Sequence, residues 1–215
     1  MNIVSFIPAR GASKGVPGKN KKILGNKPLV AWTVEDALES ELIDRVVVST
    51  EDEEISRIAR KWGAEVIPRP KELATDTADL QDAVEFTLNR LRENGYDPDY
   101  MVAMFPTSPF RRRGLVDSAI RMALDNPDIC YVHSLKRVDF DLEDLVDSDG
   151  TPYMSHEVAR DLKGCVFSTK MNFGVERMRE GPAGRRGIIL LPDESIDIDL
   201  PRDWEAAERA CARWL

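Results

Sequence analysis

The amino-acid sequence predicts one α/β domain over residues 1–215, built on a mainly parallel β-sheet with helices on both faces. Short apolar segments alternate along the chain with segments whose apolar residues recur at helical spacing. This alternation is typical of strand–helix–strand units, whose parallel strands are buried on both faces. A length of 215 residues fits one such domain. Ligands of these sheets bind beyond the carboxyl ends of the strands, so the loops there are the first candidates for a site.

The expected strands and helices follow one another in a regular order. Buried strands are expected at 2–7, 45–49, 65–68, 100–105, 129–133 and 188–191. Pro28 can begin a helix that runs to about Ser40. Thr50 and Glu53 have the spacing of a capping box and would begin the next helix. Amphipathic spacing predicts three further helices, near 80–94, 115–123 and 204–214.

The segment 136–164 departs from this order. Val138, Phe140 and Leu142 alternate there with polar residues, and an Asp-Gly pair follows as a hairpin-turn signal. We interpret the segment as a β-hairpin excursion within the domain. Because isolated hairpins are only marginally stable, its apolar face is expected to need a partner surface. The sequence therefore predicts a homodimer formed through this excursion. If the domain is an enzyme that transfers a group, the excursion is expected on the side of the active site where the acceptor substrate binds.

Composition excludes several classes of protein. Apolar residues make up 42% and charged residues 32%, and no apolar run approaches the length of about 20 residues that crosses a bilayer. A cytoplasmic location without membrane contact is therefore the expectation. The three cysteines, Cys130, Cys165 and Cys211, are widely spaced and form no pair typical of zinc sites or disulfide frameworks. A net charge of −8 argues against nucleic acid as a partner.

The N-terminal segment 1–34 reverses this acidic balance. It contains no Asp or Glu but six bases, and the loop 8–20 within it is rich in glycine. Glycines allow backbone N–H groups to approach an anion closely, and the bases neutralise its charge. The spacing matches neither a Walker A loop nor a dinucleotide-binding fingerprint. We therefore expect a compact polyanion such as a triphosphate to bind here, with a solvated surface loop as the alternative.

A pair of carboxylates near the C-terminus has the spacing of a metal site. Asp197 and Asp199 alternate with apolar residues, so both side chains would project from one side of an extended segment. Mg²⁺ commonly takes one or two carboxylates together with phosphate oxygens and water. Asp199 could instead begin the helix near Pro201, and a second Asp-x-Asp pair lies at 139–141 in the excursion. The sequence predicts Mg²⁺ at the first pair.

Short motifs are spread along most of the chain. They are Ile-Pro-Ala-Arg at 7–10 with Lys-Asn at 19–20, Gly-Asn-Lys-Pro-Leu at 25–29, Val-Ser-Thr-Glu at 48–51, Arg-Pro at 69–70 with Leu-Ala-Thr-Asp-Thr-Ala at 73–78, Pro-Thr-Ser-Pro at 106–109 with Arg111, and Ser-Ile-Asp-Ile-Asp at 195–199. In these motifs and in their order, except about residues 134–186, the chain resembles the acylneuraminate cytidylyltransferases, the CMP-sialic acid synthetase family. The resemblance implies a Rossmann-like nucleotidyltransferase fold, a homodimer, and transfer of CMP from CTP to an acidic sugar with Mg²⁺ as cofactor.

The resemblance also implies roles for individual residues. Arg10 and Lys19 would contact the triphosphate and stabilise charge during transfer, and Asp197 and Asp199 would bind magnesium. The other implied contacts are the phosphate loop of Ala9, Gly11, Ser13 and Lys14, the nucleoside contacts of Asn20, Arg69 and Ala78, and the acceptor contacts of Phe105, Thr107, Ser108 and Arg111. An acceptor oxygen would attack the α-phosphorus of CTP directly, and pyrophosphate would leave.

Two departures from the family pattern concern the acceptor. Phe105 stands where the family often has a glutamine that touches the acceptor sugar, and Asn-Phe-Gly-Val at 172–175 poorly matches a family strand. Nucleotide activation is thus better defined than the identity of the acceptor. An octulosonate or a phosphonate remains an alternative acceptor, and a catalytically silent binding module on the same fold remains an alternative function.

Overall fold

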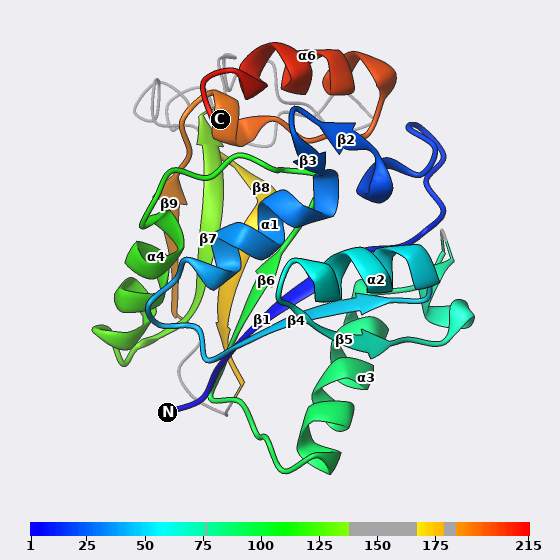
Figure 1. The fold of residues 1–215 in the computed structure, drawn as a ribbon. Helices are drawn as coiled ribbons and strands as arrows, with labels where there is room; N and C mark the ends of the chain where they lie inside the picture. Colours follow the sequence, from blue (N-terminus) through cyan, green and yellow to red (C-terminus); the bar gives the residue numbers. More distant parts are fainter. Residues whose placement is uncertain (76, 138–166, 179–183) are drawn as a thin grey trace, which may run out of the picture.

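The computed structural model describes residues 1–75, 77–137, 167–178 and 184–215. A seven-stranded sheet in the order β5-β4-β1-β6-β8-β7-β9 forms the centre of the molecule (Figure 1). Its strands are β1 (Ile3–Pro8), β4 (Arg45–Thr50), β5 (Glu65–Pro68), β6 (Tyr100–Met104), β7 (Ile129–Arg137), β8 (Phe167–Arg177) and β9 (Gly184–Ile189). All neighbouring strands are parallel except β8, which runs antiparallel to both β6 and β7. The predicted mainly parallel α/β fold is confirmed.

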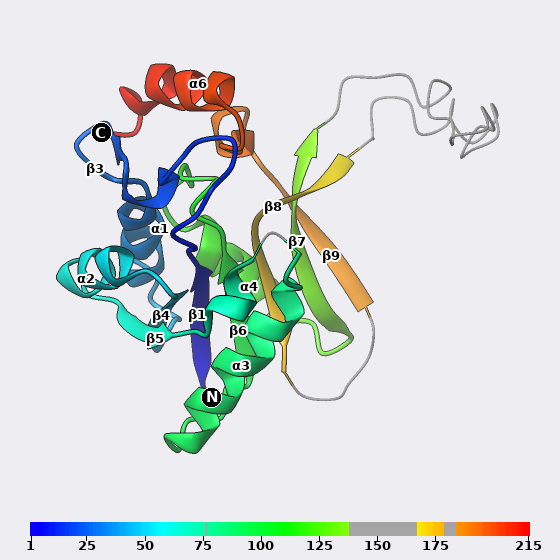
Figure 2. The ribbon, with the colours of Figure 1, turned by 90° about the vertical axis from the view of Figure 1, so that its right-hand side faces the viewer.

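Helices cover both faces of the sheet, as expected for buried parallel strands. The helices α1 (Leu29–Leu38), α2 (Glu53–Lys61) and α4 (Leu115–Leu124) contribute to one apolar core, whereas α3 (Leu80–Glu93) packs in a second core on the opposite face. Figure 2 shows α1 and α2 on one side of β1 with α3 on the other. Strand β1 serves both cores, because Ile3 and Ile7 face the first while Val4 and Phe6 face the second.

The last helix, α6 (Pro201–Cys211), lies beyond the carboxyl end of β7 (Figure 1). It packs in a third apolar cluster around Trp32, Phe110 and Trp204. The rings of Trp32 and Phe110 meet edge to face with their centroids 5.5 Å apart, and Trp214 stacks on Phe110 at 5.4 Å. A two-stranded hairpin of β2 (Ile23–Leu24) and β3 (Lys27–Pro28) joins the same region. The C-terminus is thereby fixed above the strand ends.

The start of α2 differs from the expectation. Its cap is Asp52, whose Oδ1 accepts hydrogen bonds from the N–H groups of Glu54 at 2.8 Å and Ile55 at 2.9 Å. Thr50, the expected cap, is still the last residue of β4 and is fully buried. The strand extends one residue further than expected, and the helix cap lies two residues later, at Asp52 instead of Thr50. The Thr50 hydroxyl accepts a bond from the Asp52 N–H instead.

Other differences concern the strands near the excursion. The strand expected at 188–191 lies at Gly184–Ile189, and the antiparallel strand β8 was not expected. Of the excursion at 136–164, the structure describes only residues 136 and 137, as the end of β7. Its expected hairpin and its Asp-x-Asp pair at 139–141 lie outside the described residues. Within the described ranges, no helix is long and apolar enough to cross a membrane.

Glu194 joins the C-terminal segment to the loop that precedes α4. Its side chain is fully buried and accepts hydrogen bonds from the N–H groups of Arg112 at 2.8 Å and Leu191 at 2.6 Å. Its carboxylate also pairs with the Arg112 guanidinium. We expect Glu194→Ala to lower the free energy of unfolding by at least about 2 kcal/mol, because two part-buried N–H groups and the Arg112 guanidinium lose their acceptor. Urea unfolding measures this.

The control for this variant is Glu205→Ala on the exposed side of α6, where the carboxylate has one salt-bridge contact at 4.0 Å. That change should move the free energy of unfolding by less than about 0.5 kcal/mol. Equal effects of the two substitutions would show that Glu194 does not stabilise the fold in this way.

Candidate active site

A cleft of about 240 Å³ opens beyond the carboxyl ends of β1 and β6. The loops after β1 and β6, the segment after β5 and the segment before α6 contribute to its lining. This is the place that the parallel sheet predicts for a ligand. Eight of the predicted site residues line it: Arg10, Lys19, Asn20, Arg69, Ala78, Phe105, Thr107 and Asp199.

The loop that follows β1 is held at several points. The Ala9 N–H donates to the Ser49 carbonyl at 3.0 Å, which continues the pairing of β1 with β4. Asn20 returns to the start of the loop, where its Nδ2 donates to the Arg10 carbonyl at 2.8 Å. Gly11 lies so close to Asp52 that an added Cβ would be 2.4 Å from the Asp52 Oδ2. A side chain at this position would therefore push the loop off the end of β4.

Lys19 connects this loop to the C-terminal segment. Its Nζ donates to the Ile198 carbonyl at 2.6 Å and to the Asp199 Oδ1 at 2.9 Å. The residue is only 8% exposed, although its charged end reaches the cleft. The Ile198 N–H donates to the Thr107 carbonyl at 2.7 Å, so the loop after β6 joins the same contact. Three walls of the cleft are thereby tied together.

The structure distinguishes the two interpretations of Asp199. The cap of α6 is Leu200, and the side chain of Asp203 accepts the N–H groups of Asp199 and Leu200 at 3.1 and 2.7 Å. The Asp199 side chain is therefore not the cap; it is 67% exposed, lines the cleft and pairs with Lys19. Asp197 is half-buried and does not belong to the cleft lining. The structure brings one of the two predicted carboxylates to the cleft.

Arg69 enters the cleft from the end of β5 with a carboxylate behind it. Its Nε and Nη2 both lie 3.3 Å from the Glu51 Oε2, and its side chain is 5% exposed. Burial lowers the pKa of Arg69, the Glu51 carboxylate opposes this, and the nearby charge of Arg10 adds to the lowering. Two guanidinium groups and the Lys19 ammonium thus line one cleft, as a polyanion site requires.

Two buried oxygens in this region have no hydrogen-bond partner among the described residues. They are the Asn20 Oδ1 and the Ser13 Oγ. A buried polar atom without a hydrogen bond raises the free energy of the folded state, so such atoms commonly bond to a ligand or to water. Asn20 lines the cleft and is 4% exposed. Its amide oxygen could therefore accept a hydrogen bond from a bound ligand.

The remaining predicted residues lie beneath or beside the cleft surface. Ala9 and Ser108 are fully buried, and Gly11, Ser13 and Lys14 belong to the cationic loop without lining the cleft. Sequence reasoning could not separate these positions, because a motif gives the order of residues but not their orientation.

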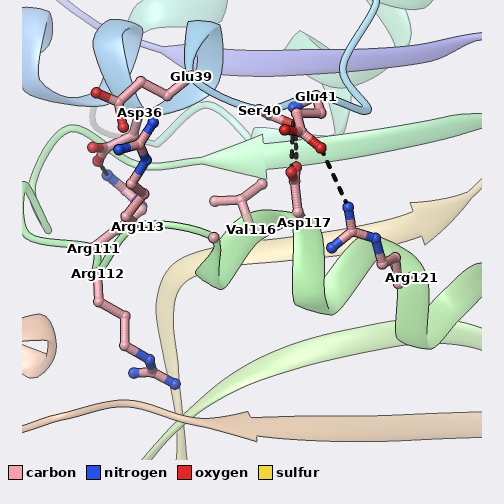
Figure 3. A pocket seen from close by; sticks show the side chains of 11 residues that line it. Asp36, Glu39, Ser40, Glu41, Arg111, Arg112, Arg113, Val116, Asp117 and Arg121 are labelled. Carbon is pink, nitrogen blue, oxygen red and sulfur yellow. Dashed lines mark hydrogen bonds and ion pairs between the residues drawn. The ribbon is translucent and has the colours of Figure 1, made fainter.

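Arg111 is also buried, away from the cleft lining. Its guanidinium donates to the Phe105 carbonyl at 2.9 Å, to Asp36 of α1 at 3.0 Å and to the Thr33 hydroxyl at 3.2 Å. Figure 3 shows Arg111 turned toward Asp36, whereas Arg112 points the other way. Burial raises the pKa of Asp36 to about 6, and the charge of Arg111 opposes that rise. Arg111 therefore supports the loop after β6 from behind rather than presenting its charge to an acceptor in this structure.

A second hollow, of about 220 Å³, adjoins Arg111 between α1 and α4. Asp117 closes one side of it by accepting bonds from the Ser40 hydroxyl and, at 3.2 Å, from the Glu41 N–H (Figure 3). Arg121 pairs with Glu41 at 3.6 Å beside them. The lining of this hollow carries both acidic and basic side chains. Such a mixture is better suited to contacts between α1 and α4 than to binding a polyanion.

An anion-binding cleft at the strand ends of a parallel α/β sheet is typical of nucleotide-binding proteins. Residues 4–156 match the family described as Cytidylyltransferase. This is most of the chain, so the protein belongs to the cytidylyltransferase family. The resemblance seen in the sequence motifs is confirmed.

Curated relatives define the branch of the family. The chain is 30% identical over 223 residues to "CMP-N,N'-diacetyllegionaminic acid synthase" from Legionella pneumophila, covering 97% of this chain and 96% of that protein. It is 38% identical over 217 residues to "N-acylneuraminate cytidylyltransferase" from Escherichia coli, covering 95% of this chain and 51% of that protein. The chain thus spans about half the length of the second relative. A "Pseudaminic acid cytidylyltransferase" from Campylobacter jejuni is 34% identical over 127 residues, covering 59% of this chain and 55% of that protein.

Solved structures share the fold at lower identity. A structure of CMP:2-keto-3-deoxy-manno-octonic acid synthetase complexed with CTP matches with a TM-score of 0.76 and 15% identity, covering 100% of both chains. A 4-diphosphocytidyl-2C-methyl-D-erythritol synthase from Anaerococcus prevotii matches with a TM-score of 0.68 and 13% identity, covering 99% of this chain and 96% of that one. These matches confirm the predicted Rossmann-like nucleotidyltransferase fold.

Gly15 provides a test of how the loop and the C-terminal segment fit together. An added Cβ would lie 1.9 Å from the Asp199 carbonyl oxygen, a backbone atom that cannot rotate away. We expect Gly15→Ala to separate the loop from Asp199 and to weaken CTP binding by about tenfold, while the protein stays folded. Calorimetric titration with CTP measures this.

The matched control is Ala12→Ser in the same loop, since Ala12 is exposed. Its affinity for CTP should remain within about twofold of the unmodified protein. If Gly15→Ala also retains full affinity, the close packing of the loop on Asp199 is not required for binding.

Proposed function

We propose that the protein transfers CMP from CTP to an acidic sugar of the nonulosonate, sialic acid-like type and releases pyrophosphate. The observation that carries this proposal is the cleft itself. The loop after β1 brings Arg10, Lys19 and Asn20 there, the segment after β5 brings Arg69, and the segment before α6 brings Asp199 beside them. A chain of the cytidylyltransferase family with these groups in one cleft is equipped to hold a nucleoside triphosphate.

The proposed reaction is a direct displacement at phosphorus. A hydroxyl oxygen of the acceptor forms a bond to the α-phosphorus of CTP and gives up its proton to solvent. The bond from that phosphorus to the bridging oxygen breaks, and pyrophosphate leaves with the electron pair. Arg10 and Lys19 stabilise the charge that develops on the phosphate oxygens. Asn20, Arg69 and Ala78 orient the nucleoside so that the reacting atoms meet in line. A covalent intermediate on the protein is not required.

Magnesium is part of this proposal. The exposed Asp199 carboxylate places a hard oxygen ligand at the cleft, next to the groups expected to hold phosphate. One carboxylate together with phosphate oxygens and water is a common environment for Mg²⁺. When bound, the ion would supply further neutralisation of the triphosphate. Asp197, two residues earlier, is retained as a second proposed ligand.

The names of the relatives guide the choice of acceptor. These relatives are named after legionaminic, N-acylneuraminic and pseudaminic acid, which are acidic sugars of one type. An octulosonate acceptor remains a second candidate, because a synthetase of that kind shares the fold, although at 15% identity. Phe105 and Thr107 line the cleft on the side opened by β6 and are the proposed acceptor contacts.

Two further expectations belong to the same proposal. The homodimer is proposed to form through 136–164, and the reaction is proposed to take place in the cytoplasm. Light scattering at micromolar concentration tests the first, and a monomer would contradict it. The dimer proposal and the transfer proposal rest on different residues, so a result that contradicts one leaves the other standing.

The function is tested with a panel of acceptors and nucleotides. Pyrophosphate release should depend on CTP together with a nonulosonate acceptor, and UTP, ATP and GTP should be poor substitutes. Preference for the octulosonate would support the second candidate. Binding of CTP without turnover of any acceptor would support a catalytically silent module, and equal use of UTP would contradict the proposed base recognition.

The two cations proposed to stabilise charge can be removed singly. Arg10→Ala and Lys19→Ala should each lower kcat by about 10²-fold or more, since each removes one preorganised charge stabiliser. Far-ultraviolet circular dichroism should remain unchanged. Lys61→Ala, in the last turn of α2 and exposed, is the control and should leave kcat unchanged. A folded variant with near-normal kcat would remove that cation from the proposed mechanism.

The metal proposal is tested by changing one carboxylate at a time. Asp199→Asn keeps the size of the side chain and an oxygen for Lys19, but removes a negative charge from the cleft. We expect a loss of about tenfold or more in activity, partly restored by high Mg²⁺ or by Mn²⁺. Asp197→Asn should behave similarly if it is the second ligand. Full activity of Asp199→Asn at low Mg²⁺ would exclude it as a ligand.

A further inference from the structure

The carboxylate of Glu51 joins two parts of the cleft that lie far apart in the sequence. Its Oε1 accepts a hydrogen bond from the Gly11 N–H at 2.7 Å, and its Oε2 lies 3.3 Å from both Nε and Nη2 of Arg69. The side chains of Glu51 and Arg69 are 13% and 5% exposed. Glu51 does not belong to the cleft lining, so it holds both partners from behind.

We propose that Glu51 is a positioning residue that couples the nucleoside end of the cleft to its phosphate end. The inference rests on the proposed function, in which Arg69 contacts the nucleoside and the loop containing Gly11 holds phosphate. The same carboxylate accepts hydrogen bonds from the Gly11 N–H and from the Arg69 guanidinium. A nucleoside that fixes Arg69 also fixes Glu51, and through it the Gly11 N–H beside Arg10.

Charge explains why a carboxylate is needed at this position. Arg69 is buried, and the charge of Arg10 disfavours a second guanidinium in the same cleft. A buried guanidinium requires a paired anion, which Glu51 supplies on its inner edge. The bonds to Glu51 occupy Nε and one N–H of Nη2, so Nη1 makes no bond to this carboxylate. The pairing therefore orients Arg69 as well as neutralising it.

The choice of glycine at position 11 belongs to the same arrangement. A Cβ at Gly11 would collide with Asp52, the neighbour of Glu51, so the loop backbone lies directly against the end of β4. The Gly11 N–H reaches Glu51 only because of this close approach. Residues 51 and 52 thus hold the loop through two different side chains, one of which also caps α2.

The test uses two probes that each report one end of the cleft, cytidine and inorganic pyrophosphate, without acceptor or added metal. Arg69→Ala should weaken cytidine binding by about tenfold and leave pyrophosphate binding unchanged. Glu51→Gln should weaken both, because an amide can accept from only one of the two partners and presents N–H groups to the other. In the Arg69→Ala background, Glu51→Gln should cause no further loss of affinity for cytidine but should still weaken pyrophosphate binding.

Controls separate positioning from general damage. Glu53→Gln, on the exposed first turn of α2, should change neither affinity. Glu51→Asp keeps the charge and should recover part of the binding that Glu51→Gln loses. In steady-state kinetics Glu51→Gln should raise the KM for CTP as well as lower kcat, whereas a defect in stability alone would reduce the active fraction and leave KM unchanged.

A measurement on the unmodified protein keeps the proposal testable if the Glu51 variants fail to fold. Cytidine, which carries no phosphate, should slow hydrogen exchange of the Gly11 amide by about tenfold. Unchanged exchange, or a folded Glu51→Gln with normal affinity for both probes, would overturn the proposal. If the unmodified protein bound neither cytidine nor CTP, the proposed function itself would fail instead.

Discussion

The contact of the Lys19 ammonium with the Ile198 carbonyl and the Asp199 carboxylate is the interaction on which the cleft depends. It brings the loop after β1 against the segment that leads into α6, so the two ends of the chain form one site. The Ile198 N–H extends the link to the loop after β6 through the Thr107 carbonyl. The sheet supplies strand ends that point the same way, and these contacts join the loops after β1 and β6 to the segment before α6.

Charge compensation by carboxylates is the second feature of the cleft. Arg69 pairs with Glu51, which lies behind the lining, and Lys19 pairs with Asp199, which itself lines the cleft. Cations held in this way are already oriented before a ligand arrives, which lowers the cost of binding a polyanion. The whole chain carries a net charge of −8, so extended polyanions are repelled while a compact one can reach the local cluster of bases. The arrangement suits a triphosphate better than a nucleic acid.

The sequence predicted those parts of the structure that depend on local pattern. Alternating apolar segments located most of the strands and helices, and Glu65–Pro68 was placed with correct bounds, because burial of both faces leaves a clear signature. The start of α2 was misplaced, because Thr50 and Asp52 are both good caps and only the length of β4 decides between them. Strand β8 was missed because it pairs antiparallel between β6 and β7, which no periodicity reveals. The buried position of Arg111 depends on Asp36, 75 residues earlier, and is equally invisible in the sequence.

The two halves of the site differ in how firmly the fold fixes them. Nucleotide-side groups are bonded to strand ends: Asn20 to the Arg10 carbonyl, and Arg69 to Glu51 directly after β4. On the side proposed for the acceptor, Arg111 fixes the Phe105 carbonyl, and Phe105 is among the residues that line the cleft. A phenyl ring in place of the glutamine common in the resembling family cannot hydrogen-bond a sugar hydroxyl, and an unmatched hydroxyl there would lose its water without replacement. With Phe105 as the proposed acceptor contact, an apolar edge of the sugar would match this position better than a hydroxyl, which would favour acyl or deoxy substituents there.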